Sequence, residues 1–472
     1  MIAIIEKVYQ FLWGDWIVLP LPGGSSFRLS LLVLILIPAG IWFTIRTRFL
    51  PIRLFPDMLH ALFEKKGKEE GESHNSTLSA LQTLIVSTAT RVGMGNLVGV
   101  VAAISAGGAG AVFWMWVTAL IGSSTAFVEA TLAQIYKEKD PVYGGYRGGP
   151  AYYMHRFIQE KRGGKKKRYV GISVLFAISG LICWCGISQV ISNSVTSAFH
   201  NAFHIPPIYT TVVLVALAAV IIFRKTATVK VLDVLVPVMA GCYFLITVIL
   251  ICMNFSALPG VFSRIFEEAF GIRQAVAGGL GTVVMNGVKR GLFSNEAGSG
   301  SAPCAAAAAE SNQPVKLGLT QALGVFIDTI VICSCTAMIM LLTPESLTEG
   351  AVGLALLQVA MGYHLGQFGV IFIAATLWLF SFSTFLGILY YARSNISYLF
   401  GDGMLPQNLY KVLALVMMFI GGLAAYTVVW DLGDVGVGLM TVFNIIMLYP
   451  MSGIAMKALK SYETEKKNRK KG

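Results

Sequence analysis

The chain has 472 residues, of which 56% are hydrophobic and only 13% are charged. Soluble proteins average about 25% charged residues, so the composition excludes a soluble enzyme, and the abundant apolar residues exclude a disordered chain. The net charge of +12 does not indicate nucleic-acid binding, because the basic residues lie in short loops between apolar runs.

Eleven segments are apolar over about the 20 residues that a membrane-spanning helix requires. In chain order, the predicted spans cover 28–46, 80–106, 108–136, 169–199, 207–223, 229–253, 274–310, 316–343, 366–400, 408–426 and 430–456. We expect the first span to be a retained helix, because it lacks the basic start and the small-residue cleavage site of a signal peptide.

Counts of Lys and Arg in the loops predict how these spans are oriented. If the N-terminus lies outside, 29 basic residues face the cytoplasm and four face outward. Cytoplasmic loops are enriched in Lys and Arg, so we expect the C-terminus in the cytoplasm of a prokaryotic inner membrane. The basic run 161–168 is interpreted as a topology anchor beside anionic lipid headgroups.

Two outer segments are too short or too amphipathic to span a membrane. In 259–272, Phe262, Ile265, Phe266 and Phe270 recur at helical spacing with charged residues between them, which predicts a helix lying on the outer face. The weakly apolar stretch 346–363 is a second such candidate. Each could be a lid or a packed loop.

Nothing in the sequence indicates an enzyme or an organic cofactor. The seven cysteines form no CxxC pair and the six histidines have no metal-ligand spacing, which argues against a zinc or redox site. Neither an HExxH nor a GxSxG motif occurs. We therefore expect no enzymatic activity.

Two predicted spans are interrupted by small and polar residues. The stretch 93–99 places three glycines around Asn96, and the stretch 290–303 is polar, glycine-rich and ended by a proline. Open backbone groups in hydrocarbon are tolerated only where they line a cavity or are buried in protein. Close helix packing through Gly95 and Gly99 is the alternative interpretation, but it leaves Asn96 and the second break unexplained.

The two breaks lie five helices apart, in the second and seventh spans. Ten helices therefore divide into two sets of five with opposite topology, as in inverted-repeat transporters with a site near the midplane. This predicts four parts: an extra N-terminal helix with a cytoplasmic linker (1–79), a first repeat (80–258), a second repeat that includes the outer amphipathic helix (259–456), and a basic cytoplasmic tail (457–472).

The residues at the breaks resemble a known family. The stretch 93–100, GMGNLVGV, resembles the GxGNxxGV signature of the alanine or glycine:cation symporters, also called the sodium:alanine symporter family. Also similar to that family are 107–116, 146–154, 291–303, 324–329 and 382–387, so the resemblance covers nearly the whole chain. It departs from the family pattern at Ala109, where proline is usual, and at Met94, where threonine is frequent.

This resemblance implies membership of the amino acid–polyamine–cation superfamily. The fold would be all-α, with about eleven transmembrane helices and a LeuT-type five-plus-five inverted repeat preceded by one extra helix. The implied function is uptake of alanine or glycine together with Na⁺ by alternating access, with glutamine preferred by some members.

The resemblance also implies which residues bind the substrate. Main-chain amides of Gly95 and Asn96 would hold the substrate carboxylate, while Asn295 and freed carbonyls near Phe293 would take the ammonium. Gln189 would complete the site; its alternative role is a hydrogen bond between helices.

A Na⁺ site is implied beside the first broken helix. The expected oxygen ligands, main-chain or hydroxyl, belong to Ala89, Val92, Phe380, Ser383 and Thr384. A bond of the Ser-Thr pair back to its own helix is the alternative.

Ionisable residues inside spans are candidates for gating or coupling. They are Arg91, Glu129, Glu296 and Asp328. Structural or gating ion pairs are expected, such as Glu129 with Arg91. Coupling to H⁺ through Glu129 or Asp328 is the rival within the same fold.

Two rivals come from other functional classes. A channel needs a continuous polar lining, and a sensor of the same fold would bind without transporting. The expected partners are a small amino acid and the lipid bilayer, with no nucleic acid, and the sequence leaves the oligomeric state open.

Overall fold

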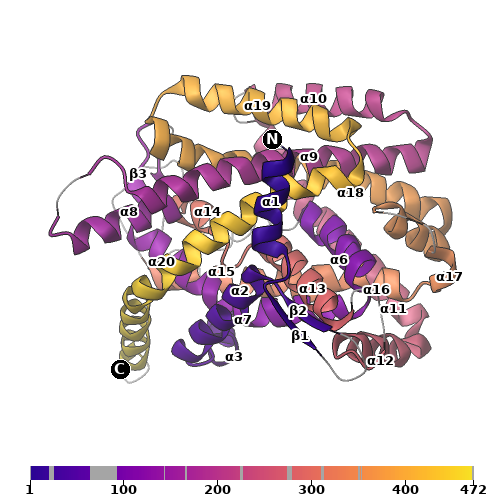
Figure 1. Ribbon diagram of the computed structural model, residues 1–472, viewed down its shortest axis with the longest axis horizontal. Helices are drawn as coiled ribbons and strands as arrows, with labels where there is room; N and C mark the ends of the chain where they lie inside the picture. The colour runs from indigo at the N-terminus through magenta and orange to yellow at the C-terminus, as the bar shows by residue number, and fades with distance from the viewer. Residues whose placement is uncertain are drawn as a thin grey trace.

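The computed structural model describes residues 2–20, 26–63, 93–142, 144–164, 167–223, 227–273, 279–309, 313–348, 351 and 353–469. Almost all regular structure in these residues is helical (Figure 1). The helices are α1 (Ile2–Trp13), α2 (Leu31–Arg46), α3 (Leu50–Arg53), α4 (Phe55–Phe63), η1 (Gly95–Gly99), α6 (Val100–Gly107), α7 (Gly110–Ile135), α8 (Pro150–Lys161), α9 (Gly171–Phe203), α10 (Pro207–Phe223), α11 (Ala227–Met253), η2 (Phe255–Ala257), α12 (Leu258–Ala269), α13 (Gly279–Asn295), α14 (Ala302–Ala308), α15 (Pro314–Phe326), η3 (Ile327–Cys333), α16 (Ser334–Leu341), α17 (Glu345–Thr348), α18 (Ala355–Phe400), α19 (Met404–Leu423) and α20 (Tyr426–Arg469).

Two short hairpins depart from the all-α expectation. Strands β1 (Ile17–Pro20) and β2 (Ser26–Leu29) pair antiparallel, as do β3 (Glu138–Lys139) and β4 (Tyr146–Arg147). The first hairpin occupies the start of the predicted span 28–46, so its helix begins only at Leu31. The hydroxyl of Ser30 accepts a hydrogen bond from the Val33 N–H at 3.3 Å and caps that helix. Hydropathy does not register such a cap.

Within the described residues, six helices are long and apolar enough to cross a membrane, or up to seven if the bent pair α11–α12 counts as one span. The same part of the chain holds three shorter apolar helices, Leu31–Arg46, Gly95–Gly107 and Pro207–Phe223. The count of eleven spans stays a prediction, since 64–92 lie outside the described residues. The chain is thus a predominantly helical, multi-pass membrane protein.

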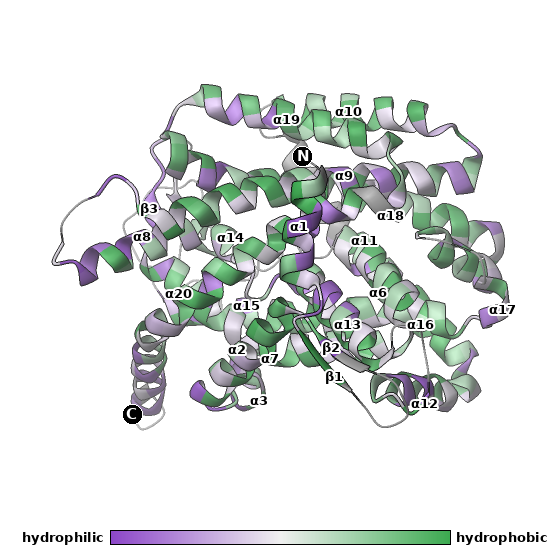
Figure 2. Ribbon diagram, viewed as in Figure 1, coloured by the Kyte–Doolittle hydropathy of each residue, from purple (hydrophilic) through white to green (hydrophobic). Residues whose placement is uncertain are grey.

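A strongly apolar face lies along α10 and α19, which run side by side at one edge of the molecule (Figure 1, Figure 2). On α19, Leu405, Leu409, Val416 and Ile420 recur at helical spacing, and each leaves about half or more of its surface exposed. Large apolar side chains exposed in a continuous row suit hydrocarbon rather than water.

The second predicted break is a true interruption of the helix. Helix α13 ends at Asn295 and α14 begins at Ala302. Between them Glu296, Gly298 and Gly300 have positive φ angles of 58°, 93° and 83°. Such angles suit glycine but strain glutamate. The first break is milder, because Gly95–Gly99 forms a π-helix that continues into α6.

The amphipathic segment 259–272 forms a helix, α12, as predicted. It caps the start of α7: Glu268 accepts the Gly110 N–H at 3.2 Å, and the Trp114 indole donates to the Ala269 carbonyl at 3.1 Å. A carboxylate at a helix N-terminus is electrostatically favourable. In the stretch 346–363, α17 is only a four-residue helix and α18 has already begun at Ala355. Helix α18 is kinked at Gly366, whose φ is 61°, where the predicted span 366–400 begins.

Helix α20 connects distant parts of the chain. It runs from Tyr426 to Arg469, and near its end Glu463 pairs with Arg53 at 2.6 Å while Lys466 pairs with Asp57. Its first half packs closely on α9. Both helices contribute glycines to this crossing.

We expect Gly186→Ala to destabilise the protein through this crossing. A Cβ at Gly186 would lie 2.2 Å from the backbone nitrogen of Gly433, so the helices must separate, at about 1–3 kcal/mol. The fraction of protein that stays monodisperse after heating measures the effect. Gly241→Ala in α11 is the control, because nothing lies within 4 Å of its Cβ and alanine favours a helix. Equal stability of both variants would contradict this account.

Candidate functional site

Asn96, in the first break, is the centre of a fully buried polar cluster. Its Oδ1 accepts the Gly93 N–H at 2.9 Å, and its Nδ2 donates to Oδ1 of Asp328 at 2.6 Å. Its main-chain oxygen accepts from the Thr336 hydroxyl at 2.8 Å. Asn96, Asp328 and Thr336 are all 0% exposed. Asn96, which was predicted to bind the substrate, thus contacts Asp328, which was predicted to take part in gating or coupling.

The predicted stretch 290–303 reaches the same cluster through Ser294, which lies in the last turn of α13, just before the interruption. Its hydroxyl donates to Oδ2 of Asp328 at 2.7 Å and lies 3.0 Å from the Cys333 sulfur. The Thr329 hydroxyl also donates to Asp328, at 3.1 Å. Asp328 lies in η3, and η3, like η1, is a π-helix. Single-turn π-helices are frequent at functional sites, and here two of them share one carboxylate.

Glycines allow the two broken segments to approach each other. A Cβ at Gly95 would lie 3.3 Å from Cα of Ser294, and one at Gly99 would lie 3.5 Å from the Phe293 ring. Gly95 therefore does provide close packing, as the alternative interpretation required, whereas a Cβ at Gly99 would make only an ordinary contact. Gly95 does so in addition to the polar contacts of Asn96, because the packed partner is the second break itself.

Asn295 presents an unused donor. Its Oδ1 accepts the Ala297 N–H at 3.0 Å, while its Nδ2 is buried without a partner in the described part of the chain. Buried polar groups are nearly always paired, so this amide is available to a ligand. Because this group is an N–H donor, it suits a carboxylate or carbonyl oxygen, whereas the family resemblance implied that Asn295 would take the substrate ammonium.

Gln189 lies away from this cluster. Its Nε2 contacts the Met417 sulfur of α19 at 3.2 Å. It lines a largely apolar groove of about 1180 Å³ between α1, α9 and α19. The contact across α9 and α19 matches the alternative role of Gln189 between helices.

Only part of the predicted Na⁺ site lies within the described residues. Ala89, Val92 and the gating candidate Arg91 fall outside them. On α18, Phe380 and Ser383 are buried, and the Thr384 hydroxyl accepts the Met94 N–H at 3.3 Å. Thr384 therefore touches the beginning of the first break.

Glu129 holds the second break in place. Its Oε2 accepts the Gly298 N–H at 3.0 Å, and its Oε1 accepts from the Asn444 amide, which also donates to the Gly298 carbonyl at 3.0 Å. Tyr153 donates to the other end of Asn444. Glu296 accepts the Ser301 hydroxyl at 2.8 Å. Both predicted glutamates thus fix the non-helical segment between α13 and α14.

A buried ion cluster, missed by the sequence analysis, joins α13 to α20. Asp434 lies 2.5 Å from Lys289 and accepts two hydrogen bonds from Arg290, at 3.1 and 3.2 Å. The guanidinium of Arg290 lies 4.0 Å from the Trp430 ring, which in turn packs on Phe293 at 5.0 Å. The sequence could have revealed it, because Asp434 is an acidic residue inside the predicted span 430–456 and such residues are functional candidates.

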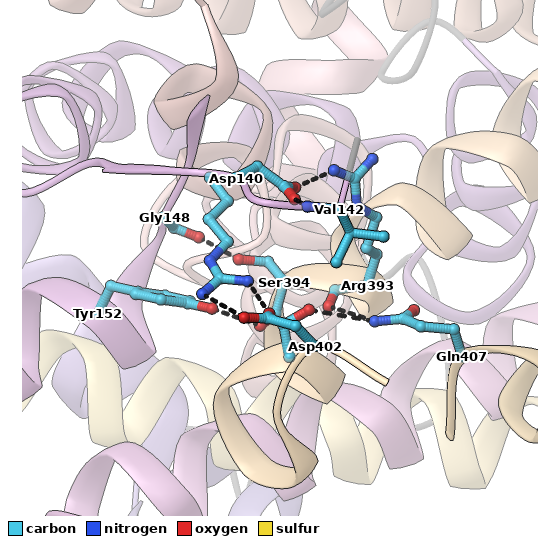
Figure 3. Close-up of polar contacts among 10 residues, drawn as sticks. Asp140, Val142, Gly148, Tyr152, Arg393, Ser394, Asp402 and Gln407 are labelled. Carbon is cyan, nitrogen blue, oxygen red and sulfur yellow. Dashed lines mark hydrogen bonds and ion pairs between the residues drawn. The ribbon is translucent and has the colours of Figure 1, made fainter. Parts of the chain in front are cut away.

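Figure 3 shows a second set of ion pairs, which ties the β3–β4 hairpin to α18 and the loop after it. Arg393 pairs with Asp140, and Arg147 pairs with Asp402. The Ser394 main-chain oxygen accepts from the Tyr152 hydroxyl at 3.2 Å. Burial raises the pKa of Tyr152, so this hydroxyl stays a donor at any physiological pH. We call these contacts the hairpin latch; Cys304 of α14 lies in the small pocket that they enclose.

We expect Asp140→Ala and Arg393→Ala each to raise the rate at which a thiol reagent modifies Cys304, by about tenfold. Asp140 is 2% exposed, and partners in such a pair are coupled by roughly 0.5–3 kcal/mol, so the double variant should add little further. Mass spectrometry of the labelled peptide measures this rate. Arg156→Ala is the control, because its pair with Glu138 is largely exposed. Additive effects of the two changes would contradict the latch.

Comparison with known proteins identifies the family of this chain. The model of the sodium:alanine symporter family matches residues 23–472. The amino-acid carrier protein AlsT of Bacillus subtilis (strain 168) is 41% identical over 447 residues, covering 94% of this chain and 91% of that protein. The probable sodium/glutamine symporter GlnT of the same organism is 41% identical over 442 residues, covering 93% and 89%.

A more distant relative aligns along the full chain. The sodium/alanine symporter AgcS of Methanococcus maripaludis is 33% identical over 474 residues, covering 100% of this chain and 99% of that protein. Among solved structures, the manganese transporter of Eremococcus coleocola aligns at 11% identity with a TM-score of 0.49, covering 82% of this chain and 81% of that one. With the family model matched along almost its whole length, this chain belongs to the sodium:alanine symporter family.

Proposed function

We propose that this protein takes up a small neutral amino acid, alanine or glycine, together with Na⁺. Membership of the family supports amino acid symport. The observation that carries the finer proposal is the meeting of both broken segments at Asn96, Ser294 and Asp328. Broken helices that meet in the interior are where transporters place their substrates.

The substrate would lie beside Gly95 and Asn295. The free Nδ2 of Asn295 would donate to the substrate carboxylate, together with main-chain amides of the first break. Open carbonyls of the break after α13 would accept the ammonium. Each formal charge of the zwitterion would then have a partner, as a dry site requires. A small substrate is favoured because the Phe293 ring fills the space beside Gly99.

Alternating access would follow from the two sets of contacts on either side of this cluster. In the proposed orientation, with the N-terminus outside, the Lys289–Arg290–Asp434 cluster closes the outer side. The hairpin latch and the Glu129 network close the inner side. The protein would use a LeuT-type five-plus-five repeat with one extra helix, in a prokaryotic inner membrane.

Uptake of radiolabelled alanine into proteoliposomes tests the function. We expect saturable uptake that requires an inward Na⁺ gradient, fails when K⁺ replaces Na⁺ and is blocked by excess glycine. Block by glutamine alone would reassign the substrate. Uptake without Na⁺ that a protonophore abolishes would overturn Na⁺ coupling and point to H⁺ transfer at Asp328 or Glu129. Unsaturable flux would indicate a channel, and binding without flux a sensor.

We expect Thr384→Val to raise the Na⁺ concentration for half-maximal uptake at least tenfold. The change keeps the shape of the side chain but removes a hydroxyl that lies against Met94, and Na⁺ prefers oxygen ligands. Thr376→Val is the control on the same helix: Thr376 is buried in α18 and its hydroxyl has no partner in the described residues, whereas Thr384 is half-buried. The same Na⁺ dependence in both variants would remove Thr384 from the site.

A further inference from the structure

Helix α1 lies outside the residues that the family model matches. Figure 1 shows it lying across the first half of α20. Gly438 of α20 permits this approach, since a Cβ there would lie 3.0 Å from the Leu12 side chain. The Trp13 indole donates to the main-chain oxygen of Asp434 at 3.0 Å. An element beyond the family match therefore contacts the ion cluster directly.

The charges of that cluster do not balance. Lys289 and Arg290 share one carboxylate, and the three side chains are only 5%, 8% and 1% exposed. Asp431, one turn earlier and exposed, attracts both cations electrostatically but lies outside the buried group. A buried cation is costly unless its surroundings compensate the lost hydration. Lys289 forms an ion pair with Asp434, and its ammonium has further N–H donors that need partners.

Helix α1 provides further contacts for the Lys289 ammonium. The Lys289 ammonium donates to the Tyr9 hydroxyl at 2.7 Å. It also lies 4.5 Å from the centre of the Tyr9 ring and 5.3 Å from that of Trp13. An ammonium close to aromatic rings is attracted by them, more strongly when it is desolvated. Two rings and a hydroxyl therefore supplement the one buried carboxylate that Lys289 shares with Arg290.

We propose that α1 is a clamp that keeps the Lys289–Arg290–Asp434 cluster closed, with Tyr9 and Trp13 as its positioning residues. Opening on this side separates α13 from α20, and Lys289 must then leave the α1 cage. The clamp thereby sets how often the buried cluster around Asn96 becomes accessible to solvent from the α1 side. The inference builds on the proposed alternating access, but it does not depend on which amino acid or ion is carried.

Cys333 reports the opening without any transport measurement. It is 3% exposed, and its sulfur lies 3.0 Å from the Ser294 hydroxyl within the Asn96 cluster. The full-length protein in proteoliposomes is treated with a membrane-impermeant methanethiosulfonate from either side, and the labelled Cys333 peptide is quantified. We expect Tyr9→Leu to raise this rate at least tenfold from the α1 side alone. Tyr9→Phe, which keeps the ring, should raise it less.

A second change separates the clamp from simple packing. Lys289→Met removes one of the two cations and leaves Arg290 paired with Asp434, so this variant should fold. In the Lys289→Met background, Tyr9→Leu should alter the labelling rate less than twofold, because the cage has lost its cation. Ile4→Ala is the control on α1, since Ile4 is 67% exposed.

Two results would overturn the clamp. One is an equal effect of Tyr9→Leu with and without Lys289, which would mean that α1 only packs against α20. The other is an unchanged labelling rate in Tyr9→Leu and in Trp13→Phe, which removes a different contact of the same helix. If labelling behaves as expected while alanine uptake shows no Na⁺ dependence, the clamp stands and the proposed function falls.

Discussion

Asp328→Leu is expected to lower amino acid uptake at least a hundredfold. The carboxylate of Asp328 accepts hydrogen bonds from Asn96, Ser294 and Thr329, and leucine leaves all three donors buried. Each unsatisfied donor costs roughly 1–3 kcal/mol, and a tenfold change in rate corresponds to about 1.4 kcal/mol. Uptake per folded protein, with the folded fraction taken from size-exclusion chromatography, measures the loss.

Asp328→Asn distinguishes the hydrogen bonds from the charge. Its amide oxygen can still accept from Asn96, and the Ser294 hydroxyl can turn to accept from the new amide. We therefore expect at least ten times more uptake than in Asp328→Leu. Equal loss in both variants would contradict a hydrogen-bonding role. It would mean that uptake requires the negative charge of Asp328. Wild-type uptake in Asp328→Leu would remove the cluster from the site.

Glu129→Leu is expected to release the segment between α13 and α14. The carboxylate accepts from the Gly298 backbone and from Asn444, and it is 1% exposed. Without it, the segment that holds Glu296 and Gly298 at positive φ loses the hydrogen bond that Glu129 makes to Gly298. Amide hydrogen exchange should become at least tenfold faster in peptides covering 296–301, and uptake should fall by a similar factor.

Glu129→Gln is the milder comparison, because it keeps one acceptor oxygen. Its exchange rate over 296–301 should lie between those of the wild type and of Glu129→Leu. A peptide from α10, which packs on α9 and α19, serves as the internal reference. If exchange over 296–301 is unchanged in Glu129→Leu, the segment is held by its own backbone contacts.

The sequence predicted the positions of the breaks better than their forms. Glycines and a proline marked 93–99 and 290–303 correctly because they act locally. They did not predict that the first would be a π-helix and the second an open segment, since neighbouring helices decide this. At the first break, the Asn96 side chain donates a hydrogen bond to Asp328. At the second, Glu129 and Asn444, from other helices, bond to the open backbone of Gly298.

Pairings between distant residues were the least predictable part of the site. Ser294 stands between two residues that the family resemblance selected, yet the resemblance passed over it. Asp434 was visible as a charge inside an apolar span, but only the packing of α13 on α20 shows that it binds Lys289 and Arg290. Tyr9 and Trp13 of α1 could not be assigned to that cluster from the sequence, because only the fold shows that they lie beside Lys289.

Helix α20 carries Asp434 of the ion cluster near its start and two ion-pair partners of the N-terminal linker near its end. About 32 residues separate Asp434 from Lys466, which is about 48 Å of helix at 1.5 Å per residue. Pro450 lies inside the helix, and the end of α20 turns away from its first half (Figure 1). Glu463 and Lys466, which pair with Arg53 and Asp57, lie beyond that proline. Spectroscopic labels on the two halves of α20 would therefore report whether an opening of the cluster is passed on to the linker or absorbed at Pro450.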